Sequence, residues 1–352
     1  MLELIPPQMT ALWMGMPIWA WLMFLVIVLV ILAVDLGLFH KEAHVPSFRE
    51  SAFLAGGAMT LGASFSIVVW WLYYHGIATS LDDDIASKTD AAQRAWTAWE
   101  LYMTGWVVEQ TLAFDNVFVM AMIFSYFAIP PQYQHRVLFY GILGVIVLRA
   151  IMIGLGAALI HQFDWILYVF SAFLLFTGVK MFIMADQKPD IGDNPVLKWM
   201  RGHMRITNEL HGQNFFVMKP DAKTGKVVRW ATPLFVSLVL IEFADLIFAV
   251  DSVPAIFAIT QDPFIVYTSN IFAILCLRSL YFVLASMVDR FHYLKYALAL
   301  VLIYVGGKIF VQQFIGKIDP AVSLTITIAI LAGGILLSLW TTRGGAEKAK
   351  TS

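Results

Sequence analysis

Cysteine and charged residues are both scarce in this chain of 352 residues. Cys276 is the single cysteine, which excludes an intramolecular disulfide and a cysteine-based metal cage. Only 13% of the residues are charged and 60% are hydrophobic, whereas soluble domains carry about 25% charged and about 45–50% apolar residues. The N-terminal region also lacks the basic flank and the small-residue cleavage site of a signal peptide, so we expect its first apolar run to be retained as a helix. This composition predicts a polytopic membrane protein.

Nine stretches are long and apolar enough to cross a bilayer as helices, which takes about 20 residues each. They cover residues 17–38, 52–75, 97–128, 137–160, 165–184, 231–259, 264–287, 293–315 and 320–341. The fold class is therefore an all-α polytopic membrane protein with about nine transmembrane helices. The third and sixth spans are longer than a crossing requires and contain acidic residues, so we expect tilted or broken helices there.

Basic residues are divided unevenly between the two sides of these spans. With the N-terminus outside and the C-terminus inside, the cytoplasmic segments hold 16 Lys and Arg residues and the outside segments hold three. Cytoplasmic loops of membrane proteins carry an excess of Lys and Arg, so this orientation is the predicted one.

The sequence contains the same membrane segment twice. Residues 109–117 align with 245–253, with acid over acid at positions 109 and 245 and again at 115 and 251. Further along, Leu148-Arg149 aligns with Leu277-Arg278, and residues 163–182 align with 291–310. Each copy spans the membrane three times, so the second copy enters in the opposite direction. This predicts a 3+3 inverted-topology repeat, the architecture that gives alternating access in secondary transporters.

The repeat divides the chain into five parts. They are an N-terminal two-helix segment with an outside loop (1–96), repeat 1 (97–184), a cytoplasmic linker (185–230), the inverted repeat 2 (231–315), and the last helix with a cytoplasmic tail (316–352). The linker is either a gate or partner contact or, as we favour, a solvated connection with one short helix near 194–204. The tail from residue 344 is expected to be disordered.

Ionisable side chains inside a bilayer cost free energy and mark functional sites. The predicted spans contain six acids and four bases, a net charge of −2 that one divalent cation would neutralise. The acids are Asp35, Glu109, Asp115, Glu242, Asp245 and Asp251, and the bases are Arg149, Lys180, Arg278 and Lys308. The two arginines are expected to serve as counter-charges that orient the acids.

A spacing of six residues places two side chains about 120° apart on a straight helix. Glu109 and Asp115, and likewise Asp245 and Asp251, would therefore converge only if their helices unwind. Pro254 lacks an amide and so frees a carbonyl near Asp251, which favours such unwinding.

The ligands gathered in this way are oxygens. Asn116 and Ser252 add neutral oxygens beside the acids, and Glu242 shares a helix face with Asp245. Mn²⁺, Ca²⁺ and Mg²⁺ prefer such ligands, whereas zinc and copper recruit Cys or His. The predicted metal site comprises Glu109, Asp115, Asn116, Glu242, Asp245, Asp251 and Ser252.

Three segments carry a resemblance to a known family: residues 33–40 with 45–50, residues 109–116, and the specific segment Glu242-Phe-Ala-Asp-Leu-Ile-Phe-Ala-Val-Asp-Ser-Val-Pro-Ala255. Over about residues 17–341 the chain resembles the TerC family of integral membrane proteins and, within it, the Alx-like branch. The family is similar to the LysE-type exporters with inverted repeats. The resemblance implies a bacterial inner-membrane protein, manganese export or metal supply to exported proteins, and a cation site at the residues named above.

The leading hypothesis is a secondary transporter that exports a divalent metal, with Mn²⁺ favoured. Desolvation and mutual repulsion favour protonation of some acids in the empty site, which makes proton antiport a natural coupling. The alternative is a membrane scaffold or sensor that partners with secretion or stress-response proteins, its acids forming structural ion pairs. An enzyme ranks last, because the sequence shows no heme-ligation pattern, nucleotide loop or cysteine pair. We expect no prosthetic group and no nucleic-acid partner.

Overall fold

Nine long helices dominate the computed structural model, which describes residues 10–39, 48–163, 165–183, 191–220, 226–284, 293–316 and 318–348. They are α1 (Ile18–Phe39), α2 (Phe48–Tyr74), α4 (Ala91–Tyr126), α5 (Pro131–Gln162), α6 (Ile166–Ile183), α8 (Pro233–Phe257), α9 (Pro263–Leu284), α10 (Leu294–Ile315) and α11 (Pro320–Lys348). Eight of them are long and apolar enough to cross a membrane, and α1 adds a shorter apolar stretch, Ile18–Val34. The all-α polytopic class is confirmed.

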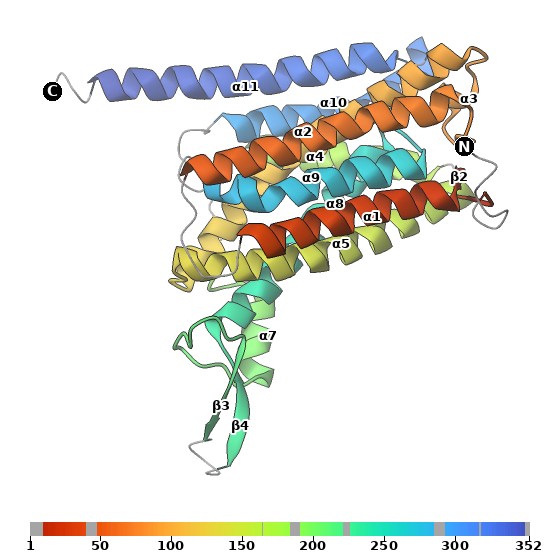
Figure 1. The fold of residues 1–352 in the computed structure, drawn as a ribbon. Coiled ribbons are helices and arrows are strands. Elements are labelled where there is room, and N and C mark those ends of the chain that lie inside the picture. The colour runs from red at the N-terminus through yellow and green to blue at the C-terminus, as the bar shows by residue number, and fades with distance from the viewer. Residues whose placement is uncertain are drawn as a thin grey trace.

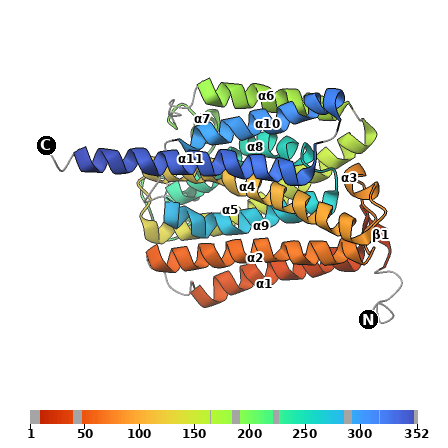
Figure 2. The same cartoon turned by 90° about the horizontal axis from the view of Figure 1, so that it is seen from above.

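The long helices lie side by side in one bundle (Figure 1). Helix α9 is the most enclosed, with 83% of its most apolar stretch buried, and α2, α4 and α5 pack around it. In the view from above, α1 and α2 lie along one side of the bundle and α6 along the opposite side (Figure 2). Helices that are apolar all round need such a core or a lipid environment.

Contacts between the two predicted repeats follow a reciprocal order. Helix α4 packs on α9 as α5 packs on α8, and α6 packs on α10. The α6–α10 crossing is close because glycine lies on both sides of it. A Cβ added at Gly178 would lie 2.9 Å from Ala299 O, and one added at Gly306 would lie 2.8 Å from Ser171 O. These contacts are what a pseudo-two-fold relation requires, and the inverted repeat itself stays a prediction.

The two ends of the bundle differ. One, here called the α3 end, carries the short helix α3 (Asp83–Ala86), the 258–262 loop and the last turn of α5. The other, the α7 end, carries α7 (Pro195–His203) and the hairpin of β3 (Phe216–Pro220) and β4 (Val227–Ala231), which projects from the bundle (Figure 1). Helix α7 confirms the short helix expected in the linker, but the antiparallel hairpin was not expected. A two-residue pair, β1 (Leu12–Trp13) with β2 (Met16–Pro17), precedes α1.

Two buried carboxylates hold the α3 end together. Asp82 accepts hydrogen bonds from Thr260 Oγ1 at 2.6 Å and from Gln261 N at 2.8 Å. Asp262 accepts one from Ser80 Oγ at 2.7 Å and caps the start of α9. Burial raises the pKa of both carboxyl groups above the ordinary value, against the opposing effect of these hydrogen bonds. Asp82 thus binds the 258–262 loop, and Asp262 of that loop binds the segment that precedes α3.

Two expectations about the helices, a break beside the acids and a disordered tail, are wrong, and the tilt expected as the alternative to a break stays a prediction. Helices α4 and α8 are continuous through the acids, and α8 passes through Pro254 and ends at Phe257. Proline within a helix removes one hydrogen bond, and here the surrounding packing, with Val253, Pro254 and Ala255 buried, holds the helix in place. Helix α11 also runs to Lys348, so the tail from residue 344 begins as helix rather than as a disordered segment.

Candidate functional site

Two acids that align in the sequence repeat meet in the core of the bundle. Glu109 lies on α4 and Asp245 on α8, and both are buried, with 4% and 1% of their surface exposed. Both bind the same guanidinium group, that of Arg149 on α5. The site therefore draws one acid from each predicted repeat.

Arg149 is itself 1% exposed and donates to both carboxylates. Its Nη1 forms an ion pair with Glu109 Oε1. Its Nη2 lies 3.2 Å from Asp245 Oδ1 and its Nε lies 3.3 Å from Asp245 Oδ2, a two-pronged contact. Arginine in this planar geometry recognises carboxylates with high specificity. The role of Arg149 as a counter-charge is the one expected from its sequence.

Neutral oxygens complete the cluster. Asn116 donates from Nδ2 to Asp245 Oδ1 at 3.1 Å, and Ser252 Oγ accepts from Arg149 Nη1 at 2.8 Å. Asn270 on α9, which the sequence reasoning missed, places its Oδ1 3.5 Å from the same Nη1. Four helices thus contribute to one buried polar centre, here called the Arg149 cluster: Glu109, Asn116, Arg149, Asp245, Ser252 and Asn270.

Glu242 lies at the edge of this cluster, half-buried, one turn before Asp245 on α8. It lies close enough to Asp245 for the two charges to interact. Its carboxylate faces α5 so closely that a Cβ added at Gly144 would overlap it. Within the described residues, Glu242 Oε2 is buried and has no hydrogen-bond partner.

The remaining candidates lie elsewhere. Asp251 faces α6, where Thr177 hydrogen-bonds to it and Lys180 supplies nearby positive charge. Because α8 does not unwind, Asp251 keeps the rotation of about 120° from Asp245 that a straight helix gives. The side chain of Asp115 lies outside the described residues. Arg278 is buried, and the described hydrogen bonds of Glu109 and Asp245 involve Arg149, Asn116 and Asn270 instead.

Among the described residues, no group of three or more His, Cys, Asp or Glu side chains is placed to hold a metal ion. The Arg149 cluster offers two carboxylates with a guanidinium between them. Its oxygens suit a hard divalent cation once that guanidinium is displaced. In this structure the guanidinium occupies the space between the two carboxylates.

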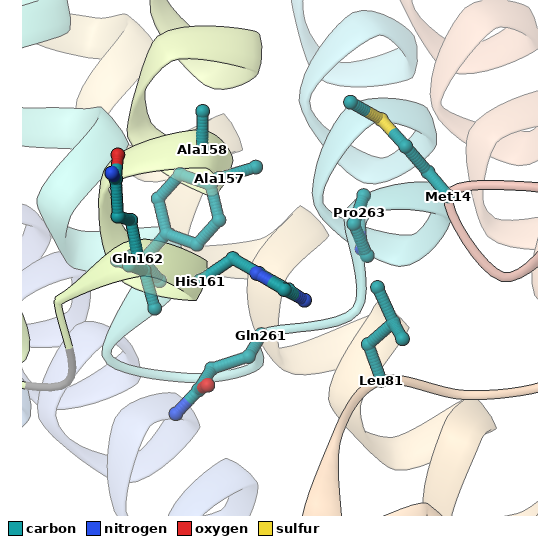
Figure 3. Close-up of a pocket in the computed structure, with 10 residues that line it drawn as sticks. Met14, Leu81, Ala157, Ala158, His161, Gln162, Gln261 and Pro263 are labelled. Carbon is teal, nitrogen blue, oxygen red and sulfur yellow. The ribbon is translucent and has the colours of Figure 1, made fainter.

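A cavity of about 550 Å³ opens at the α3 end. It is lined by Met14, Leu81, Ala157, Ala158, Ile160, His161, Gln162, Phe257, Gln261 and Pro263. In Figure 3 the His161 side chain extends from α5 toward Gln261 of the 258–262 loop and toward Pro263, the first residue of α9. Phe257 packs on Gly156, where an added Cβ would lie 2.7 Å from the ring. Phe257 lines the cavity and follows Ser252 on α8 by five residues.

Comparison with known proteins identifies relatives over nearly the whole length. A sequence model described as "Integral membrane protein TerC family" matches residues 94–346. Proteins named as a membrane-bound redox modulator, Alx, from Salmonella typhi and from Escherichia coli K12 are 44% identical over 321 residues, which is 91% of this chain and 94% of theirs. An uncharacterized membrane protein of Rickettsia bellii is 43% identical over 320 residues, 91% of this chain and 97% of its own. No solved structure matches.

Proposed function

Because the chain belongs to the TerC family of integral membrane proteins, we propose that it is a secondary transporter that exports a divalent metal cation, with Mn²⁺ the favoured substrate. The observation that carries this proposal is the meeting of Glu109 and Asp245 in the core of a membrane bundle, each from a different predicted repeat. Buried acids at the interface between two repeats are typical of ion sites in secondary transporters.

The chemistry of the cluster supports a hard cation. Two carboxylates balance a charge of +2, and Ser252, Asn116 and Asn270 supply hydroxyl and amide oxygens from three helices. Mn²⁺, Ca²⁺ and Mg²⁺ use oxygen ligands of this kind. Manganese is favoured among them through the family resemblance.

The path through the protein follows from the two ends of the bundle. The cavity at the α3 end is the outer vestibule in this proposal, and the inner barrier that we assign to it is Phe257, which lines it and packs on Gly156. The α7 end faces the cytoplasm, because the described basic residues of the linker lie there while the Asp82–Asp84 run lies at the α3 end. Glu242 and Asp251, half-buried on α8, are the carboxylates that guide the ion to and from the centre.

Rocking of one repeat against the other would expose the cluster alternately, with the close α6–α10 crossing as the contact that both states share. Proton antiport is the coupling we propose, since metal must replace protons on any carboxyl group that is neutral in the unloaded state.

The relatives' name describes a redox modulator, and one alternative function follows from the ion pairs. A single cysteine, Cys276, gives this chain no intramolecular dithiol couple. The two-pronged Arg149–Asp245 contact is, however, also what a purely structural ion pair would form. In that case the protein is a membrane scaffold or sensor, and loss of Asp245 lowers its stability without changing cellular metal.

Elemental analysis of cells separates the two functions. A strain without its own manganese exporter is loaded with Mn²⁺ and expresses the wild type, Asp245→Asn or Asp193→Asn at equal membrane abundance. Asp193 is an exposed acid far from the cluster and serves as the matched control. The transporter lowers cellular manganese in the wild type and the control, but not in Asp245→Asn. Equal manganese in all strains, with or without the protein, contradicts the proposal.

A further inference from the structure

We propose that the Arg149 guanidinium is a tethered cation that holds the metal position of the unloaded protein and moves to Glu242 when a divalent cation binds. This inference rests on the proposed function. It adds an account of how the negative charges of the buried acids are balanced when no metal is bound. It makes Arg149 a built-in competitor of the substrate.

The first observation is that the guanidinium uses the oxygens a metal would use. Glu109, Asp245, Ser252 and Asn270 all direct an oxygen to Arg149. A divalent cation on the same oxygens would face the positive guanidinium at contact distance in a site closed to water, where repulsion is strong. Metal and guanidinium therefore exclude one another.

The second observation is a buried carboxylate oxygen that can accept hydrogen bonds from the displaced guanidinium. Glu242 Oε2 is buried and, within the part of the chain that the structure describes, has no hydrogen-bond partner. It lies against α5 at Gly144, about 7.5 Å along the helix axis from Arg149. Gly144 and Arg149 lie about 140° apart around α5, so the route of the guanidinium to Glu242 runs along α8, where Asp245 already binds it. Asp245 and Glu242, three residues apart on α8, have Cβ atoms about 5–6 Å apart. A shift of one helical turn carries the guanidinium from one carboxylate to the other.

Gly144 makes this position available. Any larger side chain there would overlap the Glu242 carboxylate, so glycine lets the acid lie on the backbone of α5, one turn of α8 from the Asp245 carboxylate that binds Arg149. The second repeat has an arginine at the equivalent position, Arg278, but Glu242 has no equivalent in the first repeat, where Trp106 stands. The exchange therefore involves one arginine of the two.

Charge balance favours the exchange. With a divalent cation on Glu109 and Asp245 and the guanidinium on Glu242, three carboxylates face three positive charges. Without the metal, the guanidinium returns to the two acids that would otherwise repel one another. When the guanidinium occupies the site in most unloaded molecules, only the remaining fraction can bind metal. The apparent Kd for metal is then the intrinsic Kd divided by that fraction. This weaker binding eases the release of the metal on the far side of the membrane.

The test is a Mn²⁺ titration of the purified full chain by calorimetry, with variants confirmed as monodisperse by size-exclusion chromatography. Arg149→Met removes the competitor, and we expect its apparent Kd for Mn²⁺ to fall about tenfold or more, as for a site blocked in nine-tenths of the molecules. Arg278→Met, the same change at the equivalent buried arginine, leaves the Kd unchanged. Glu242→Gln weakens binding about tenfold in the wild type, because the displaced guanidinium loses its acceptor. In the Arg149→Met background the same change has little effect, which separates an acceptor from a direct metal ligand.

Wild-type binding together with equal or weaker binding by Arg149→Met overturns this inference and leaves the proposed function standing. If Arg149→Met is not monodisperse, Arg149→Gln, which also removes the positive charge, replaces it in both the single and the double variant, and the same outcomes decide. If wild type and all variants bind no Mn²⁺, both the inference and the proposed function are overturned.

Discussion

Gly306→Ala is expected to weaken the α6–α10 crossing, whereas Gly307→Ala is not. A Cβ at Gly306 would lie 2.8 Å from Ser171 O and 3.0 Å from Leu175 N, both backbone atoms of α6. The nearest atom to a Cβ at Gly307 would be Leu175 Cδ2 at 3.7 Å, an ordinary contact. The two glycines are neighbours in one helix and therefore form a matched pair.

The expected magnitude follows from these distances. Nonbonded carbon contacts have their optimum near 3.5–4.0 Å, so α6 must move by about 0.7 Å or more to admit the methyl group of Gly306→Ala. Overpacking of this kind costs about 1–3 kcal/mol. Both substitutions gain up to about 1 kcal/mol of helix propensity. That gain cancels in the comparison, so the free energies of unfolding of the two variants should differ by about 1–3 kcal/mol, with Gly306→Ala the less stable.

Thermal unfolding monitored with a thiol-reactive dye measures this difference directly, because Cys276 is the single cysteine and is fully buried in α9. Gly306→Ala should unfold at a lower temperature than Gly307→Ala, by roughly 2 °C or more. Equal midpoints, or a lower midpoint for Gly307→Ala, would refute the packing of α6 on α10 described above.

Three further outcomes are expected. Since burial raises the pKa of Asp82, its stabilising contribution is fully present below its ordinary pKa and is lost as the pH rises through the raised value. The unfolding temperature of the wild type should therefore rise relative to that of Asp82→Asn as the pH is lowered from neutral toward the ordinary pKa of aspartate, and a constant difference would argue against it. The second prediction uses Ser252→Cys in a background where Cys276 is replaced by serine. In that background Phe257→Ala should open the vestibule and raise the rate at which a water-soluble thiol reagent labels residue 252 at least severalfold. An unchanged rate would show that Phe257 is not the barrier. In Mn²⁺-loaded cells Asp251→Asn should slow export less than Asp245→Asn, because Asp251 faces α6 rather than the guanidinium, and the reverse order would move the binding site to Asp251.

The membrane fold could be predicted because each helix carries its own signal. Long apolar runs have few alternatives to a membrane helix, and the structure has helices at all nine predicted positions. The ends of these helices were less accurate, because α4 and α5 begin several residues before their apolar stretches, where polar residues continue the helix. The β3–β4 hairpin was missed because its five-residue strands have too little alternation to stand out in a polar linker.

The candidate site was found in part, since its acids stand out in apolar sequence but their partners depend on tertiary packing. The spacing of six residues drew attention to Asp251, whereas a spacing of seven places side chains on one helix face. Seven separates Glu109 from Asn116 and Asp245 from Ser252, which all lie in the Arg149 cluster. That spacing was a usable signal. Asn270 was recognisable only as a polar residue in an apolar helix, and the meeting of α5 with α4 and α8 at Arg149 required the structure.

Flux measured with purified protein tests the central claim most directly. Wild type, Asp245→Asn and the control Asp193→Asn are reconstituted separately into liposomes that contain a Mn²⁺-quenched fluorophore, and quenching is followed after external Mn²⁺ is added across a proton gradient. We expect quenching well above that of protein-free liposomes for wild type and Asp193→Asn, and only background quenching for Asp245→Asn. Wild-type quenching no faster than protein-free liposomes, or equal quenching by Asp245→Asn, would contradict a transport site built on Glu109 and Asp245.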